Sequence, residues 1–390
     1  MNMVNWTTRR EVLRGTALKE MLVLGETPSW FPEVCVLPFR ILALNPGSTS
    51  TKVALFEDEQ MTWESNVVHP AQELARHKRI SDQMPMRLEA IVSEMQTASR
   101  AGSDLSAIAA RGGLLRPVDA GTYAITENMV QDLREAKRGE HASNLGAIIA
   151  FELASKWCIP AYTVDPVSVD EFCAAARITG LPDLERKSLL HALNIRAVAR
   201  LACKDLGIKF EDANLVVAHL GSGTSVCPIR KGRIIDVNNA NEEGPFSTER
   251  AGSLPAGDLV RLCFSGKYTK EQLIRRITSE GGMYAHLGTK DVRETLARVR
   301  DGDGRARLVF EAMIYQTGKE IGAMATVLCG DVDAVVVSGG ASYSDTVIDA
   351  LKKMVSYIAP VLVYPGGDEM ASLAQGVLRV LKGEESPRQY

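Results

Sequence analysis

The segment ILALNPGSTSTKVALFED occupies residues 41–58 and places a glycine- and hydroxyl-rich turn between two aliphatic runs. This pattern is typical of a β-hairpin. In a short glycine turn, backbone N–H groups can point together at an anion, and serine or threonine hydroxyls add neutral donors. Lys52 offers a positive charge for a nucleotide phosphate. Taken alone, the turn is compatible with an ordinary hairpin tip as well as with a phosphate site.

The same turn recurs later in the chain. H-L-G-S-G-T-S from His219 aligns with N-P-G-S-T-S-T from Asn45, glycine on glycine and serine on serine, and it follows the aliphatic run 215–220. A third glycine turn from Ser338 closes the apolar run 334–337, and the run 361–364 leads into P-G-G-D-E. This internal repeat predicts two similar α/β halves, and the three turns together favour an ATP cleft between them.

Hydrophobic periodicity gives the elements between the turns. Leu88, Ile91, Val92 and Met95 form a helical stripe, and further helices are expected near 143–157, over 185–205 and over 370–382. Strands are expected at 105–110 and 159–164. Gly207 is expected to end the helix 185–205. Residues 1–38 show no persistent period, so they are expected to form a separate extension with at most one short helix.

Composition excludes several classes of protein. The 45 Lys and Arg nearly balance the 48 Asp and Glu, which disfavours nucleic acid and anionic membranes as partners. No apolar run is long enough to span a bilayer, and no signal peptide is recognisable, so a cytoplasmic protein is expected. The seven cysteines include no C-x-x-C, and the six histidines show no zinc-binding spacing.

Common nucleotide-binding motifs are absent as well. The sequence has neither the P-loop G-x-x-x-x-G-K-[ST] nor a G-x-G-x-x-G that opens a helix after a strand. The protein-kinase signatures H-R-D and D-F-G are also missing. A kinase acting on a small acceptor is therefore favoured over these classes.

Eight collinear segments between residues 40 and 384 stand out: NPGSTSTK (45–52), RGGLLRPV (111–118), HASNLG (141–146), AHLGSGTS (218–225), DVNNA (236–240), EGPFSTERAGSLPAGDL (243–259), CFSGKYT (263–269) and YPGGDEMASLAQG (364–376). Together they resemble the butyrate kinase family, which is related to acetate kinase. The resemblance implies an α/β fold of duplicated actin-like, ribonuclease H-like domains with an ATP cleft between them. It also implies the reversible reaction of ATP with butanoate to give ADP and butanoyl phosphate.

The resemblance assigns roles to four residues around the moving phosphoryl group. Arg111 resembles the carboxylate-binding arginine, although a surface salt bridge is the simpler reading of the residue alone. Arg250 resembles the arginine that neutralises the transferred phosphoryl group. His191 aligns with a histidine that contacts this group, but its apolar helix face suits a core histidine equally well. Asp165 occupies the place of an essential aspartate.

The resemblance also implies Mg²⁺ and ATP sites. Asn45 and Glu369 look like the magnesium-associated pair, acting partly through water. Glu369 is equally compatible with a favourable charge at a helix N-terminus. The residues implied to bind ATP are Ser48, Ser50, Lys52, His219, Gly221, Ser222, Gly223, Asp291, Arg293, Gly339, Gly340 and Ser344.

Three features depart from the family pattern. Ser222 stands where glycine is usual, and it would be strained if this position needs a positive φ. The loop 238–246 looks one residue short, and Thr248 replaces a usual proline. These changes lie near the expected cleft and bear on efficiency and acyl-chain preference.

The domain boundaries and the competing functions follow from these points. Residues 1–39 are expected to be an extension, for which disorder is one expectation. Residues 40–165 are expected to form one domain, with 371–390 packing back on it, and residues 166–370 the other. A homodimer or a higher homo-oligomer is expected. A branched-chain fatty acid kinase, an acetate or propionate kinase, and an actin-like ATPase remain alternatives.

Overall fold

The predicted hairpin is present as β1 (Arg40–Pro46) and β2 (Ser50–Glu57), which pair antiparallel with Asn45 opposite Lys52. The computed structural model describes residues 37–98 and 102–390, of which 39–390 form one unit. The predicted N-terminal extension therefore lies almost wholly outside the described residues.

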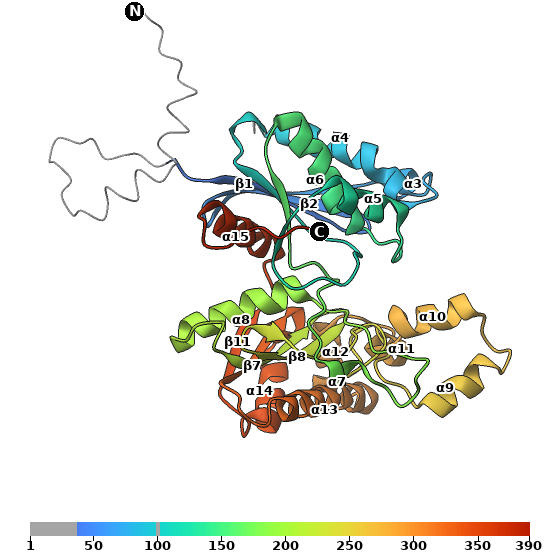
Figure 1. The fold of residues 1–390 in the computed structure, drawn as a ribbon. Coiled ribbons are helices and arrows are strands. Elements are labelled where there is room, and N and C mark those ends of the chain that lie inside the picture. The colour runs from blue at the N-terminus through green and yellow to red at the C-terminus, as the bar shows by residue number, and fades with distance from the viewer. Residues whose placement is uncertain (1–36, 99–101) are drawn as a thin grey trace, which may run out of the picture. The chain divides into compact units, whose positions relative to one another are not determined.

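Two sheets organise the chain (Figure 1). The first has the order β3-β2-β1-β4-β6-β5, and the second has the order β11-β10-β7-β8-β9. In both, an antiparallel hairpin (β1–β2 or β7–β8) is extended on its other side by a parallel strand, β4 or β10. The internal repeat predicted from the glycine turns is thus confirmed as a repeat of strand order.

The first sheet carries helices on both faces. Its elements are β3 (Gln60–Val68), α3 (Ala71–Leu74), η1 (Ile80–Gln83), α4 (Met84–Thr97), η2 (Gly102–Asp104), β4 (Ala107–Ala110), β5 (Thr122–Ala124), α5 (Glu127–Glu135), α6 (Asn144–Trp157) and β6 (Ala161–Val164). Side chains alternate along β1, so Leu42 and Leu44 pack with α4, α5 and α6 while Ile41 and Ala43 pack against α15 (Glu369–Leu381).

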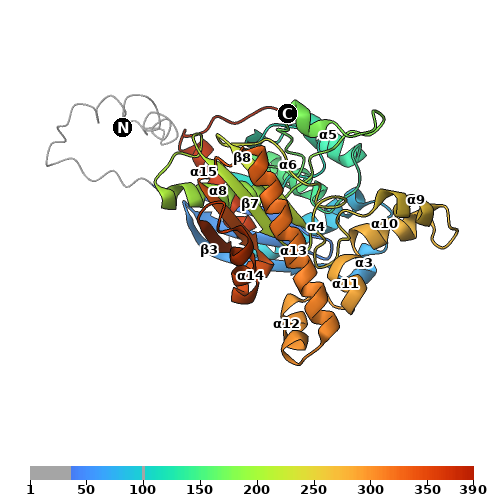
Figure 2. The ribbon, with the colours of Figure 1, turned by 90° about the horizontal axis from the view of Figure 1, so that it is seen from below.

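The second sheet repeats this layering. Its elements are α7 (Ala174–Arg177), α8 (Ala192–Leu206), β7 (Asn214–Leu220), β8 (Thr224–Arg230), β9 (Arg233–Ile234), α9 (Ala256–Cys263), α10 (Lys270–Thr278), α11 (Gly282–Leu287), α12 (Val292–Arg300), α13 (Gly304–Val327), β10 (Ala334–Gly339), η3 (Gly340–Tyr343), α14 (Asp345–Val355) and β11 (Val361–Pro365). Leu215 and Val217 of β7 pack with α8, whereas Val216 and Ala218 pack with α13 and α14. Figure 2, seen from below, shows α13 lying across this sheet.

Helices α8 and α15 lie between the two sheets and contact each other, as Figure 1 shows. Leu193 of α8 belongs to the same apolar cluster as Leu373 and Val377 of α15. The two halves therefore meet through this helix pair. The ends of β1, β4 and β7 and the first turns of both helices are the elements that supply the site described below.

The predicted helix over 185–205 was wrong at its start, because α8 begins at Ala192. Residues 185–190 are held by tertiary contacts that a helix would break. Arg186 pairs with Asp236 and Glu243, and the hydroxyl of Ser188 donates to the carbonyl of Val169. Gly207 does end the helix with a φ of 69°, as predicted.

Candidate active site

Four polar side chains from distant parts of the chain meet where the two halves face each other. Asn45 Nδ2 donates to Glu369 Oε2 over 2.5 Å, and Arg111 Nη1 lies 2.7 Å from the same oxygen. Arg111 Nη1 also contacts Asn45 Oδ1 at 3.3 Å, and Asn194 Nδ2 lies 3.4 Å from Glu369 Oε1. The predicted metal pair and the predicted carboxylate-binding arginine thus form one cluster.

The local sequence explains how these groups are positioned. Asn45 lies near the end of β1, and Arg111 directly follows the parallel neighbour β4. Glu369 is the first residue of α15, after Asp368, whose side chain caps the helix by accepting the N–H of Ala371. Asp368 caps the helix, and the carboxylate of Glu369 contacts Asn45 and Arg111 instead.

Two histidine rings lie beside this cluster, with their centroids 4.5 Å apart. His191 Nδ1 is 2.9 Å from the hydroxyl of Ser225, and His219 Nδ1 is 3.2 Å from the hydroxyl of Ser338. The prediction that His191 lies on an apolar helix face was wrong. It is the residue before α8 begins, with φ −81° and ψ 58°, and its ring points to β8.

Burial keeps both imidazoles neutral. Removal from water, opposed by the charge of Glu369 and assisted by that of Arg111, lowers the pKa of His219 to about 4. Burial lowers the pKa of His191 well below its ordinary value, as do the charges of His219, Arg250 and Arg111. Neutral imidazoles can donate one N–H without adding a titrating charge near pH 7.

Arg250 lies against the second glycine turn. Its Nη1 donates to the carbonyl of Ala240 over 3.1 Å, and its buried Nε has no hydrogen-bond partner among the described residues. A Cβ at Gly223 would overlap the guanidinium, with Cζ 2.7 Å away. Position 223 therefore favours glycine because Arg250 approaches it closely. Its backbone does not have a positive φ, so the conformation itself does not call for glycine.

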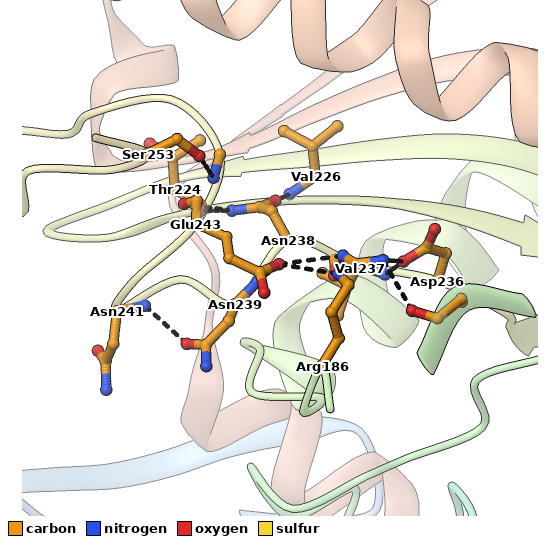
Figure 3. A network of polar contacts seen from close by, with 12 residues as sticks. Arg186, Thr224, Val226, Asp236, Val237, Asn238, Asn239, Asn241, Glu243 and Ser253 are labelled. Carbon is orange, nitrogen blue, oxygen red and sulfur yellow. Dashed lines mark hydrogen bonds and ion pairs between the residues drawn. The ribbon is translucent and has the colours of Figure 1, made fainter. Parts of the chain in front are cut away.

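The loop that presents Ala240 to Arg250 is held by a polar network, which Figure 3 shows. Arg186 contacts Asp236 Oδ1, the carbonyl of Val237 and Glu243 Oε2 at 2.8–3.0 Å. Asn238 bridges the loop to β8, accepting the N–H of Val226 and donating to the carbonyl of Thr224. The loop that looked short in the sequence is thus fixed at both of its ends.

Asp165 stands at the end of β6 in a left-handed conformation, with a φ of 39°. Its Oδ1 accepts the N–H of Gly121 over 2.7 Å and lies 3.1 Å from Arg196 Nε. Asp165 lines one narrow pocket together with Arg111, His191 and Glu369. Asn194 also lines this pocket. Three of the predicted catalytic and substrate residues, namely Asp165, His191 and Arg111, are thus brought together.

A larger cavity of about 930 Å³ opens beside the β7–β8 turn, α12 and η3. This volume falls within the range of about 300–1,000 Å³ that is usual for small-molecule sites. Six residues predicted to bind ATP line it: Gly221, Ser222, Asp291, Arg293, Gly340 and Ser344. Gly339, with a φ of 91°, packs tightly on the backbone of Leu220 and allows β10 to turn into this wall.

Two members of this set pair with each other at the cavity rim. Asp291 caps α12 and lies 2.6 Å from Arg293 Nη2, and these contacts lower the pKa of its carboxyl to about 2. Ser222 is absent from the non-glycine residues with positive φ. The strain that a serine would suffer in that conformation does not arise, so the second turn accepts Ser222.

The first glycine turn is clamped from behind. The fully buried Arg87 of α4 donates to the carbonyls of Gly47 and Ser48 at 2.8 and 3.0 Å. Ser48, Ser50 and Lys52, all predicted to bind ATP, line neither of the two cavities above. Lys52 is exposed and lies opposite Asn45 in the ladder. Their phosphate contacts stay a prediction.

Sequence reasoning missed several groups at the site. Asn194 follows His191 by three residues, a helical spacing that would have indicated it. His141 lies in the quoted segment 141–146, and the charges of Arg111 and Arg250, after burial, lower its pKa. Ser225 and Ser338 contact the histidines from two different strands. No sequence signal indicates those two pairings, because the register of β7 with β10 creates one and the packing of the start of α8 on β8 creates the other.

Within residues 37–98 and 102–390, no helix has the length and apolar character needed to cross a membrane. The same residues contain no cluster of three or more His, Cys, Asp or Glu arranged to hold a metal. All six cysteines of this part of the chain are unpaired.

Comparisons with known proteins agree on one family. The acetokinase family profile matches residues 185–357. The chain is 51% identical to the probable butyrate kinase 2 of Caldanaerobacter subterraneus subsp. tengcongensis over 352 residues, which cover 90% of this chain and 99% of that protein. It is 47% identical to butyrate kinase 1 of Clostridium acetobutylicum over 353 residues, with the same coverage. Among solved structures, the acetate kinase of Porphyromonas gingivalis superposes with a TM-score of 0.71 at 19% identity, covering 88% of this chain and 100% of that one.

Proposed function

Because the chain belongs to the acetokinase family, we propose that it is a butyrate kinase, which transfers the terminal phosphoryl group of ATP to butanoate and forms ADP and butanoyl phosphate. The single structural observation that carries this proposal is the narrow pocket lined by Arg111, Asp165, His191 and Glu369. A carboxyl acceptor and a phosphoryl donor are both anions, and this pocket offers a cation and neutral donors to them.

Arg111 is the proposed anchor for the carboxylate of butanoate. Its contacts to Asn45 and Glu369 both use Nη1, so Nη2 and Nε remain for a planar two-oxygen contact. Because Glu369 holds the guanidinium from one side, the orientation of Arg111 is fixed before the acid binds. The acid then needs little further ordering to present an oxygen to the phosphorus.

Arg250, His191 and His219 are the proposed donors to the phosphoryl group. Arg250 keeps its charge although burial lowers its pKa, and its buried Nε is free to donate to an anionic oxygen. For Nε2 of His191 to donate an N–H, the hydroxyl of Ser225 must donate its proton to Nδ1. The acceptor oxygen forms the new P–O bond as the bond to ADP breaks, and no proton has to move.

The Mg²⁺ ion that this chemistry uses fits the donor set of Asn45 and Glu369. One carboxylate and one amide oxygen suit an ion that keeps several waters and takes its other ligands from phosphates. The bound ion would neutralise charge on the nucleotide phosphates. The nucleoside of ATP is proposed to lie in the cavity lined by Gly221, Asp291 and Gly340.

Acyl-chain preference, assembly and location complete the proposal. Branched-chain, acetate or propionate kinase activity differs from the proposed one only in the volume offered to the acyl chain. The actin-like ATPase alternative is disfavoured, because an enzyme that only hydrolyses ATP does not need one arginine for a carboxylate and another for the phosphoryl group. We also propose a homo-oligomer and a cytoplasmic location, where ATP is supplied and unpaired cysteines stay reduced.

A hydroxamate assay, which traps acyl phosphates, tests the function. The protein is incubated with ATP, Mg²⁺ and each acid from acetate to hexanoate, together with isobutyrate. The greatest kcat/KM is expected with butanoate. Preference for isobutyrate or acetate would replace the proposed substrate, whereas ATP hydrolysis without any acyl phosphate would support the ATPase.

A further inference from the structure

A third cavity, of about 260 Å³, lies between α8 and α15. Val164, Asp165 and Leu193 line both this cavity and the narrow site pocket, so the two are separated by a shared wall. Its volume is slightly below the usual range of small-molecule sites, about 300–1,000 Å³, and far below that of the nucleoside cavity. A small ligand would fit it, and a nucleotide would not.

Five cationic side chains line the cavity, against three carboxylates, those of Glu59, Asp165 and Glu384. Arg196, Arg200 and Lys204 follow one another at four-residue steps along α8, so they share one helix face. Arg379 of α15 and Lys382, the residue directly after this helix, line the cavity from the opposite side. Like charges at this helical spacing destabilise a helix unless an anion compensates them.

Three of these five cations already have partners. Arg196 Nε lies 3.1 Å from Asp165, Arg379 Nε lies 3.0 Å from Glu385, and Lys382 Nζ lies 3.4 Å from Glu59. Arg200 has no such contact. Its Nε is buried and has no hydrogen-bond partner among the described residues.

The surroundings of Arg200 favour an anion. Its guanidinium lies over the ring of Phe210, with Cζ 4.4 Å from the ring centroid. Burial, then the charges of Arg379 and Arg196, lower its pKa. Arg200 is half-buried and its buried Nε lacks an acceptor, so an anionic group in the cavity would supply the missing contact.

From this geometry we infer that the cavity between α8 and α15 is an anion site that binds a phosphate group through Arg200 and Lys204. A guanidinium and an ammonium together suit a doubly charged phosphate. The remaining volume leaves room for a few carbon atoms, so free phosphate and a small phosphomonoester share the required chemistry. A ligand there would also meet Arg196, whose Nε lies 3.1 Å from Asp165 in the shared wall.

Calorimetric titration with inorganic phosphate tests the site without using enzyme activity, so its outcome is independent of the proposed function. The proposed phosphoryl site also attracts phosphate, and each protein is therefore titrated in an Arg250→Ala background. Arg200→Gln is expected to weaken binding about tenfold or more, because it removes a charge-assisted contact. Lys204→Gln, at an exposed position, is expected to weaken it severalfold.

Arg261→Gln is the matched control, since this exposed arginine of α9 pairs with Asp258 and does not line the cavity. It is expected to bind phosphate as the parent does. Titration with glycerol 3-phosphate distinguishes free phosphate from a small phosphomonoester as the ligand. Tighter binding of glycerol 3-phosphate than of inorganic phosphate would identify a phosphorylated metabolite. Circular dichroism checks that each variant is folded. If Arg200→Gln is unfolded, the phosphate affinity of Lys204→Gln is the test of the site. Equal phosphate affinity of the folded variants and the parent overturns the inference, as does the absence of binding.

Discussion

Gly223→Ala is the substitution that most directly tests how Arg250 is positioned. Position 223 has an ordinary backbone conformation, so alanine is not strained there by φ. The added methyl group would instead overlap the guanidinium of Arg250, whose Cζ lies 2.7 Å from the ideal Cβ. Either the arginine or the glycine turn must move.

The distances set the size of the effect. Ordinary contacts of a Cβ begin near 3.4 Å, so the Cζ of Arg250 must retreat by at least 0.7 Å, the difference from 2.7 Å. The displacement of a catalytic group by about 1 Å can cost about 100-fold in rate. We expect kcat to fall by about this factor. The loss of folding stability should stay within about 1–3 kcal/mol, as for other overpacked sites.

Acyl phosphate formation at saturating ATP and butanoate gives kcat, and urea unfolding gives stability. Gly304→Ala is the control, because a methyl group there meets no atom within 4 Å. In a double-mutant cycle, Gly223→Ala should cost little further activity once Arg250 is already alanine. A kcat for Gly223→Ala within twofold of the parent would refute the positioning argument. If Gly223→Ala lowers kcat equally in the parent and in the Arg250→Ala variant, the effect comes from a change in the glycine turn and not from a displacement of Arg250.

Three further expectations follow from the same site. Arg250→Ala should abolish turnover while calorimetry still detects ATP binding, and near-normal turnover would remove Arg250 from the mechanism. Ser225→Ala should lower kcat about tenfold with little change in the KM for ATP, since it frees the ring of His191; an unchanged kcat would show that the 2.9 Å contact is structural only. Burial lowers the pKa of His69 and of His219 to about 4, whereas the unfolded chain binds these protons near pH 6.5. Stability should therefore be full above pH 6.5 and fall as the pH drops to 4, by at most about 3 kcal/mol per histidine; urea unfolding at pH 7 and pH 4.5 measures it, and equal stabilities would contradict the burial argument.

The sequence predicted most of the fold because its signals were local. The aliphatic runs 41–44 and 215–218 beside glycine turns indicated strands, and the two sheets contain them, with successive side chains packing on opposite faces. The aligned turns at Asn45 and His219 indicated the duplication, which the matching strand orders confirm. The start of α8 could not be predicted, because residues 185–190 are held by partners more than fifteen residues away.

The site was predicted less completely, for a physical reason. Motif resemblance selected Asn45, Arg111 and Glu369, and the structure brings these three into direct contact. It gave no hint of Arg87, which holds the first glycine turn from a helix 40 residues later. It also gave no hint of Ser225, whose contact to His191 depends on how the start of α8 packs against β8. A contact between single side chains of two distant elements produces no periodicity or motif in the sequence, so it cannot be predicted from local patterns.

Asp165 shows how the two cavities on either side of it are linked. Its left-handed backbone, at a φ of 39°, costs on the order of 1 kcal/mol or more and persists only where surrounding contacts fix it. Those contacts are the N–H of Gly121 and the guanidinium of Arg196, and both meet the same oxygen, Oδ1. Arg196 in turn lines the cationic cavity that also holds the unpaired Arg200. An anion bound in that cavity would compete with Asp165 for the positive charge of Arg196. Binding there would therefore alter the position of Asp165 in the narrow site pocket, through the ion pair between Arg196 and Asp165.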